Sequence, residues 1–544
     1  MKKTIGQTII KIMSIIFSIF FVVILFNTIF FNRMITIDFN IPLMIIGTIV
    51  IYFALFGLYY IYNKKNWKFL EYKPKKSEIL CVLLIIFIVQ YIVAKLLYAY
   101  IGWDCGEVIK SAFTLLQGEK CNIMYYMQYP NNVGMLLLMK YVFVIAKQFT
   151  DMTVISNAFF VAIIFNIIIV DLAALFTFLT IKKVLGIKKA YFSLIFILPL
   201  IVFSPYIVIP YTDTLTMIFP IMTLCLYLTI KELPEESIKK YLLILLLGIE
   251  LIFGINLKPT VVIMPIAIFI IEILNINKET MKSFKENVLK KIFYAVLILL
   301  IFSLGCGTTY FGYNKLKNKN LGKYISKEDS ELYSIPFSHF LMMGMQTRLN
   351  DTKEAGKNQI LYGAYSGNDV INTTSVNGYK EKQKYNIEIV RERLKNFGCL
   401  GYLSFLYNKA NWILSDGTFF YGHEGHWIVN DYYNKTDLAI ELQKFINVED
   451  DMYINVTANI MQILWILITL GLVLSYSKNS DKYVDVGKLA IIGIVLFILL
   501  FEGRSRYLLN HLPVFLFIGT YGLTDSFNKL TKIFEKLVLT LKLK

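Results

Sequence analysis

The sequence predicts an all-α polytopic membrane protein with about twelve transmembrane helices. Of its residues, 56% are apolar and only 17% are charged, whereas a soluble domain usually carries about 25% charged residues. The apolar residues come in blocks, such as 9–31 and 79–100, each interrupted by one lysine and long enough to cross the hydrocarbon core as a helix. A membrane β-barrel would instead show alternating segments of about ten residues, and the sequence has no such pattern.

Twelve apolar segments are expected to span the membrane as helices, because a helix satisfies its backbone hydrogen bonds internally. One further apolar segment, 132–148, is shorter and carries Lys140 and Lys147 on one helical face. It is expected to lie in the outer membrane interface. The predicted spans are 9–31, 41–62, 79–100, 153–180, 189–209, 214–230, 240–256, 258–275, 291–312, 456–476, 486–501 and 508–524.

The distribution of basic residues predicts the orientation. Lys and Arg are concentrated in the N-terminal residues, the C-terminal tail and short loops, which the positive-inside rule places in the cytoplasm. The formal net charge of +17 does not indicate nucleic-acid binding, because the long polar segment 313–455 holds 17 basic and 17 acidic residues. The loops expected to be cytoplasmic are 63–78, 181–188, 231–239, 276–290 and 477–485.

The chain is expected to have four parts. About 140 residues can bury a core, and residues 387, 390, 394 and 397 of the polar segment are apolar at helical spacing. The parts are an N-terminal transmembrane hairpin with its loop (1–78), a transmembrane core with a first outer loop at 101–152 (79–312), an extracytoplasmic mixed domain inserted before the last three helices (313–455), and the C-terminal helices with a basic tail (456–544).

Six cysteines occur, and two of them share the first outer loop. Cys105 and Cys121 could form a disulfide, although spacing alone does not establish a pair. Cys81, Cys225 and Cys306 fall within predicted spans, where cysteine is most simply a small packing residue.

Acidic residues follow or precede two spans on the outer side. Asp104 and Glu107 come directly after the third span, and Asp213 precedes the sixth. A carboxylate at a span end can act as a general base on an acceptor hydroxyl. Each site also has a structural interpretation: Asp104 with Glu107 has the shape of a capping box, and Asp213 can cap the sixth span.

Basic residues also lie at outer span ends, against the positive-inside rule. Lys258 precedes a proline between two spans, and Arg504 and Arg506 lie beside Tyr507 between the last two spans. Cations beside apolar helices need an anionic partner, and the planar guanidinium group matches phosphate oxygens well. The alternative is a structural ion pair between Arg504 and Glu502.

All four histidines are expected on the outer side. His423, Glu424 and His426 suggest a metal cluster, but the two histidines are three residues apart with a glycine between them, unlike the spacing of zinc proteases. We therefore expect His339, His423, Glu424 and His426 to lie at the edge of an outer cleft and expect no metal ion or other cofactor.

Together these motifs resemble the GT-C superfamily of membrane glycosyltransferases. The resemblance lies in an Asp after an early span, an outer interfacial helix, Tyr211-Thr212-Asp213, Lys258-Pro259-Thr260 and the late Glu502-x-Arg504-x-Arg506-Tyr507, with the segments 335–345 and 412–419. It is closest to bacterial family-39-like, protein-mannosyltransferase-like enzymes. Protein mannosyltransferases have adjacent Asp and Glu in the first outer loop, whereas two residues separate Asp104 from Glu107 here.

The resemblance implies a polyprenyl-phosphate sugar as donor and an extracytoplasmic active site. Asp104 is then the base that activates an acceptor hydroxyl for inverting attack, and Asp213 orients the acceptor or supports the base. Lys258, Arg504 and Arg506 would hold the departing phosphate, with Tyr507 beside them. The implied partners are membrane lipid, the lipid-linked donor and an acceptor in the cell envelope, and the implied location is the plasma membrane.

Two other functions remain open. A polysaccharide polymerase or ligase would use a diphosphate-linked donor and rely on outer Arg and His residues, such as Arg506 and His511. A transporter or flippase of lipid-linked sugars would carry polar groups near the bilayer midplane, for which Asp171 and Glu250 are the main candidates.

Overall fold

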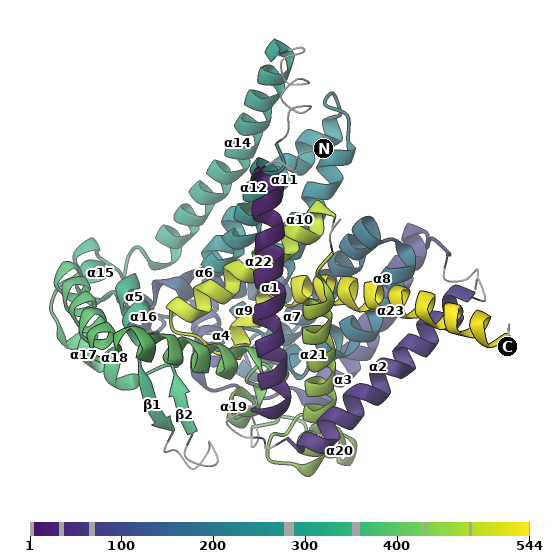
Figure 1. The fold of residues 1–544 in the computed structure, drawn as a ribbon. Coiled ribbons are helices and arrows are strands. Elements are labelled where there is room, and N and C mark those ends of the chain that lie inside the picture. Colours follow the sequence, from purple (N-terminus) through teal and green to yellow (C-terminus); the bar gives the residue numbers. More distant parts are fainter. Residues whose placement is uncertain are drawn as a thin grey trace.

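The computed structural model describes residues 5–31, 37, 39–64, 71–276, 288–350, 359–428, 431–477 and 481–542. This part of the chain is mostly helical, and nine of its helical segments are long and apolar enough to cross a membrane. The chain is therefore an all-α polytopic membrane protein (Figure 1). The nine segments are α1 (Ile5–Phe30), α2 (Ile41–Lys64), α3 (Lys76–Leu97), α7 (Ile155–Leu185), α8 with its extension (Ile187–Val208), α9 and α10 (Thr212–Glu232), α14 (Val288–Leu321), α21 with its first turn (Tyr453–Leu474) and α22 (Lys482–Leu500).

The other three predicted spans coincide with helices outside this set of nine. They are α11 (Ile238–Leu257), α12 (Ile263–Leu274) after the short turn η5 (Pro259–Val262), and α23 (Leu512–Lys542). With its preceding turn, α12 belongs to a shorter apolar stretch, Pro259–Leu274. The number twelve thus stays a prediction, while the position of every predicted span is matched by a helix.

Loops that were expected to share one side of the membrane contact one another. Lys183 Nζ at the end of α7 lies 2.5 Å from Glu232 Oε2 at the end of α10, and Lys188 Nζ lies 2.7 Å from Glu71 Oε1. The opposite end of α10 begins beside Asp213, which contacts Lys258 after α11. These contacts place the loops 63–78, 181–188 and 231–239 at the same end of the bundle. Parts of the loops 63–78, 276–290 and 477–485 lie outside the described residues.

Helix α6 (Val133–Ala146) forms in the segment expected to be interfacial, and it packs against the bundle. Its 14 residues rise only about 21 Å, which is less than the hydrocarbon thickness of about 30 Å. Met135, Leu136 and Met139 are fully buried, and the helix packs against α4 (Trp103–Leu116), α7, α11 and α14. Lys140 contacts Asn320 Oδ1 near the end of α14. Lys140 is therefore used in helix packing while Lys147 is exposed, and the position of α6 in the membrane interface stays a prediction.

The N-terminal helices pack against the C-terminal part of the chain. Helix α1 stands in front of the bundle in the view of Figure 1 and contacts α21, α22 and α12. Phe17 and Phe21 are each 1% exposed, and Lys488 Nζ of α22 donates to Ser14 Oγ at 2.7 Å. Helix α2 packs against α21 and α23. Both N-terminal helices therefore pack against helices near the C-terminal end of the sequence.

The segment after α14 contains the strands and most of the short helices. Its first part, from α15 to the middle of α18, has a small apolar cluster of its own around Met342, Met345 and Val390. The helix expected from the spacing at 387–397 is confirmed as part of α18, which is kinked at Gly398 (φ 61°). The elements are α15 (Lys327–Tyr333), α16 (Phe337–Met343), the antiparallel strands β1 (Thr347–Asn350) and β2 (Gln359–Tyr362), α17 (Gly367–Ser375), α18 (Tyr379–Leu414), α19 (Tyr421–Glu424) and α20 (Asp437–Gln443).

Beyond the kink, α18 enters the transmembrane bundle. Tyr407 OH donates to Asn27 Oδ1 of α1 at 2.8 Å, and Trp465 Nε1 of α21 donates to the carbonyl of Leu414 at 2.7 Å. Ile413 and Leu414 have no exposed surface. This segment therefore carries residues 415–424 into the interior, where they help to build the site described below.

Glycines bring α21 and α23 into direct backbone contact. A Cβ atom at Gly471 would overlap the carbonyl oxygen of Gly519, and one at Gly522 would overlap that of Gly471. We expect Gly471→Val to lower the free energy of unfolding by about 3 kcal/mol, because the helices must separate. Thermal unfolding in detergent measures the loss. Gly307→Val in α14 is the control, since a Cβ there meets nothing within 4 Å; an equal loss in both variants would contradict the close-packing explanation.

Candidate functional site

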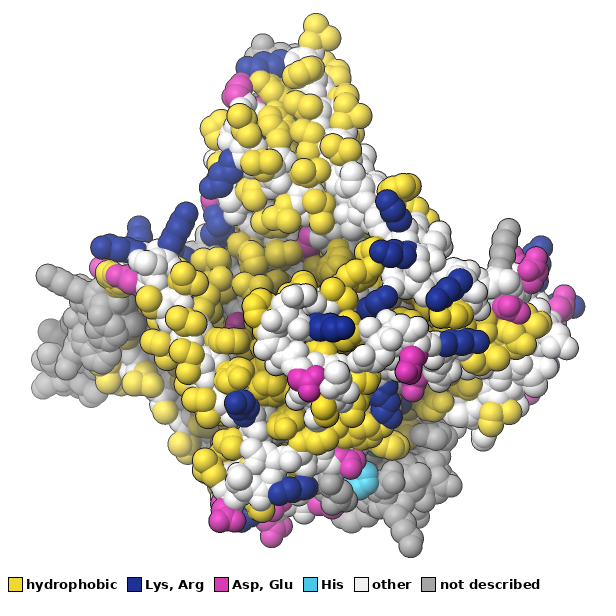
Figure 2. All heavy atoms as spheres, turned by 180° about the vertical axis from the view of Figure 1, so that it is seen from behind, with side chains coloured by type: hydrophobic (Ala, Val, Ile, Leu, Met, Phe, Trp, Pro, Cys, Tyr) yellow, Lys and Arg dark blue, Asp and Glu magenta, His cyan; other side chains and the backbone are white. Residues whose placement is uncertain are grey.

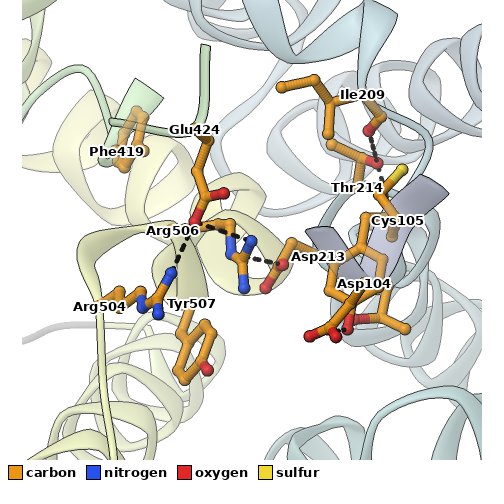
Figure 3. Close-up of polar contacts among 12 residues, drawn as sticks. Asp104, Cys105, Ile209, Asp213, Thr214, Phe419, Glu424, Arg504, Arg506 and Tyr507 are labelled. Carbon is orange, nitrogen blue, oxygen red and sulfur yellow. Dashed lines mark hydrogen bonds and ion pairs between the residues drawn. The ribbon is translucent and has the colours of Figure 1, made fainter. Parts of the chain in front are cut away.

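Charged side chains from four parts of the chain meet in one set of ion pairs, and Figure 3 shows Asp213, Glu424, Arg504 and Arg506 among them. We call this set the ionic cluster. It contains three acidic and three basic residues, so its formal charges balance. The members are Asp213 in α9 (Thr212–Leu215), Lys258 after α11, Glu424 at the end of α19, and Glu502, Arg504 and Arg506 around the start of the turn η9 (Ser505–His511).

Arg506 joins the two sides of the cluster. Its Nε lies 3.1 Å from Asp213 Oδ2 and its Nη1 lies 2.9 Å from Glu424 Oε1, while only 5% of its side chain is exposed. Its guanidinium carbon lies 4.5 Å from the ring centroid of Trp103 and 5.2 Å from that of Tyr211. Burial opposes the charged form, but Glu424 and Asp213 raise the pKa of Arg506 well above its usual range. A cation held by two carboxylates and two aromatic rings is fixed in position.

Arg504 and Lys258 are more exposed than Arg506. Arg504 Nη1 lies 2.9 Å from Glu424 Oε1 and its Nε lies 3.6 Å from Glu502 Oε1, with 18% of the side chain exposed. Lys258 contacts Asp213 Oδ1, is 13% exposed and lies 4.6 Å from the ring centroid of Tyr507. The structural pair of Arg504 with Glu502 thus exists, but Glu424 is the closer partner.

Asp416 positions the loop that delivers Glu424. Its carboxylate accepts hydrogen bonds from the backbone N–H of Thr418 (2.8 Å) and Phe420 (2.6 Å) and from Ser505 Oγ (2.7 Å). Phe419 and Phe420 have φ angles of 54° and 68°, which non-glycine residues rarely adopt. The three hydrogen bonds hold this strained turn and connect it to the turn that carries the arginines.

Asp104 lies beside the cluster, on its exposed side. It is in the first turn of α4, and its Oδ1 accepts a hydrogen bond from Tyr125 OH at 2.8 Å, while Tyr211 OH lies 3.5 Å from Oδ2. Burial and the neighbouring Asp104 carboxylate raise the pKa of Tyr125 well above its usual range, so this phenol remains a donor. Asp104 itself is exposed and has no ion-pair partner among the described residues.

Both predicted helix caps are wrong. The N-cap residues are Gly102 for α4 and Tyr211 for α9, and Asp104 and Asp213 each lie inside the first helical turn without a capping hydrogen bond. The helices begin one residue before each carboxylate, and the carboxylates contact a tyrosine hydroxyl (Asp104) and two cations (Asp213).

Several predicted site residues do not join the cluster. Glu107 accepts a hydrogen bond from Ser111 Oγ at 3.3 Å, one turn later in α4. His339 is buried beside α17, where its Nδ1 bonds Thr373 Oγ1 at 2.8 Å. His426 Nδ1 lies 3.2 Å from Glu449, and His423 stacks on Phe420 with ring centroids 4.8 Å apart. Of the predicted edge residues, only Glu424 is part of the cluster.

The cysteines of the first outer loop and the side chains that could bind a metal ion are the remaining candidate features of the site. Cys105 and Cys121 are both buried and unpaired, so the considered disulfide is absent from the structure. Cys105 Sγ instead donates to the carbonyl of Pro210 at 3.4 Å. Among the residues that the structure describes, no three His, Cys, Asp or Glu side chains are placed to hold a metal ion.

Comparison with known proteins identifies the family. A family model described as a conserved hypothetical integral membrane protein matches residues 5–527. The chain belongs to this family. No curated protein and no solved structure matches the chain. The match includes every member of the ionic cluster as well as Asp104, so the whole site lies within the region that defines the family.

For this member of the integral membrane protein family, a buried lysine anchors the turn that carries the arginines. Lys409 of α18 has no exposed surface, and its Nζ donates to the carbonyls of Gly344 (2.7 Å), Leu499 (3.0 Å) and Phe501 (2.7 Å). Three backbone acceptors around one ammonium group fix the end of α22 immediately before Glu502.

We expect Lys409→Met to lower the free energy of unfolding by about 2 kcal/mol, because three buried carbonyl groups lose their donor. Thermal unfolding in detergent is the measurement. Lys384→Met, at an exposed position of the same helix, is the control and should change stability by less than about 0.5 kcal/mol. Equal effects in the two variants would show that Lys409 does not anchor the turn.

Proposed function

We propose that this membrane protein is a glycosyltransferase that moves a sugar from a polyprenyl-phosphate carrier to an acceptor, with inversion. The observation that carries the proposal is the position of Asp104. It is an exposed carboxylate without an ion-pair partner among the described residues, beside a set of buried cations. A free base next to cations suits a reaction in which a hydroxyl loses a proton and a phosphate departs.

The reaction is a single displacement. Asp104 takes the proton of the acceptor hydroxyl, and the hydroxyl oxygen forms a bond to the anomeric carbon of the sugar. The bond from that carbon to the phosphate oxygen breaks, and the polyprenyl phosphate leaves with the electron pair. The carrier supplies the leaving group, so the proposal needs no nucleotide, and it invokes no metal ion.

The two arginines have different parts in this proposal. Arg506 is nearly buried and its charge is already matched by Asp213 and Glu424, so we assign it to positioning. Arg504 and Lys258 keep some exposed surface beside Tyr507. The leaving phosphate would bind there by taking the place of a carboxylate, most simply Glu502, whose contact with Arg504 is the longer one at 3.6 Å.

The proposed location is the outer face of the plasma membrane, because the basic loops at the other end of the bundle are those that the positive-inside rule places in the cytoplasm. The similarity of the motifs to GT-C enzymes supports the same side. With the exposed native residues Cys81 and Cys399 replaced by serine, a cysteine introduced at Glu119, an exposed position in the loop after α4, should react with a membrane-impermeant maleimide in intact cells. Labelling only after permeabilisation would contradict this orientation.

The test of the function is transfer by purified protein in detergent, with envelope acceptors present. Radiolabelled polyprenyl-phosphate hexoses are compared with diphosphate-linked oligosaccharides. We expect label to leave the monophosphate donors only. Consumption of diphosphate donors would favour a polymerase or ligase, and movement of an intact lipid-linked sugar across proteoliposomes would favour a flippase.

A further inference from the structure

A cavity of about 250 Å³ lies between α10, α11, α12 and α14, away from the ionic cluster. Its wall is almost entirely apolar, with Phe269 and Phe302 among the lining residues. Two carboxylates, Glu250 and Glu272, also line it. An ionisable side chain at membrane depth is costly and usually has a function, so the partners of these two groups decide what the cavity can hold.

The two carboxylates differ in their partners. Glu272 lies 3.0 Å from Lys482 Nζ and 4.0 Å from Lys231 Nζ, and it also contacts Tyr227 OH. Glu250 is 3% exposed and accepts only from the neutral Thr223 Oγ1, at 2.8 and 3.0 Å. Among the described residues, no cation lies within ion-pair distance of Glu250. A buried carboxylate without a counterion is unstable unless a ligand supplies one or a proton neutralises it.

Glycines shape the wall beside Glu250. A Cβ atom at Gly248 would overlap the carbonyl oxygen of Phe302, and one at Gly305 would overlap that of Leu245. Helices α11 and α14 therefore touch through their backbones at this point, and Phe302 closes one side of the cavity. In its most apolar stretch only 6% of α14 is buried, and it projects from the bundle in Figure 1. Hydrophobic side chains cover much of the projecting part of the molecule in Figure 2, so we expect the outer side of this wall to face the lipid.

We infer that the cavity binds a small amphipathic amine, with its ammonium group paired to Glu250 and its apolar body against Phe269 and Phe302. The size is suitable, because an apolar cavity of about 150 Å³ already accommodates benzene. An ammonium group supplies the counterion that Glu250 lacks. An apolar body contacts the apolar wall of the cavity, to which water cannot form hydrogen bonds. The site is separate from Asp104 and does not depend on the proposed transferase activity.

The competing occupant is a lipid chain, which carries no positive charge and would lie beside a protonated Glu250. The test therefore compares phenylbutylammonium with phenylbutanol, which differ chiefly in charge. Binding to the full chain in nanodiscs is measured by calorimetry, and empty nanodiscs give the contribution of partition into lipid. We expect the amine to bind at least about ten-fold more tightly than the alcohol.

Two variants test whether Glu250 causes the preference for the amine over the alcohol. Glu250→Gln keeps the shape and a hydrogen-bonding group, so we expect the alcohol to bind as before and the ten-fold preference for the amine to disappear. Glu272→Gln, whose carboxylate is already paired, should keep the preference. Equal binding of the two probes to the wild-type protein overturns the proposal without any variant, and so does a preference that survives in Glu250→Gln.

Discussion

Replacing Asp104 with asparagine is expected to lower the rate of sugar transfer by about 10²- to 10⁴-fold, the usual contribution of a general base. Asparagine keeps the shape of the side chain and can still accept from Tyr125 OH, which now bonds Oδ1 at 2.8 Å. It cannot take the proton of the acceptor hydroxyl. The measurement is release of label from a radiolabelled polyprenyl-phosphate hexose by purified protein, at equal amounts of folded enzyme.

Two companion variants identify the cause of that loss. Glu119→Gln removes an exposed carboxylate from the loop after α4 and should leave transfer unchanged. Tyr125→Phe removes the hydrogen bond but not the base, so we expect a fall of about 10- to 100-fold, the net value of one hydrogen bond to a charged group. Full activity in Asp104→Asn would remove Asp104 from the mechanism, whatever the donor proves to be.

The sequence predicted the positions of the helices well because membrane burial acts on whole segments. A block of about 20 apolar residues has few alternatives to a spanning helix, and each predicted span is matched by a helix. The lysines of 132–148 were harder to interpret, because Lys140 bonds Asn320, 180 residues later in the chain. Periodicity shows which residues share a face but not which helix covers that face.

The sequence predicted which residues belong to the candidate site better than it predicted which of them contact one another. Charged groups at span ends led to Asp104, Asp213, Lys258, Arg504 and Arg506, and all of these lie together. Asp416 was not predicted as a site residue, although it is the one charged residue of the segment 412–421 and lies in the segment 412–419 that the resemblance used. The full role of Glu424 could not be predicted, because it depends on the left-handed conformation of Phe419 and Phe420.

Because Arg506 is paired with two carboxylates, its replacement should lower the stability of the protein as well as affect the site. A phosphate-binding arginine that is free in the resting protein can be removed with little loss of stability. Arg506 instead separates two buried carboxylates, with 2% of the side chain of Asp213 and 2% of that of Glu424 exposed. Without the guanidinium group these carboxylates keep only the partial compensation of Lys258 and Arg504.

We therefore expect Arg506→Gln to lower the free energy of unfolding by about 3–5 kcal/mol, the usual cost of breaking a buried ion pair. Thermal unfolding in detergent measures it, with Lys444→Gln as the control, because Lys444 forms an exposed pair with Glu441 worth less than about 1 kcal/mol. Adding Glu424→Gln to Arg506→Gln should restore part of the loss, since one unpaired charge is then removed. If Arg506→Gln unfolds like the wild type but no longer binds the donor, Arg506 is a phosphate ligand and the assignment to positioning is wrong.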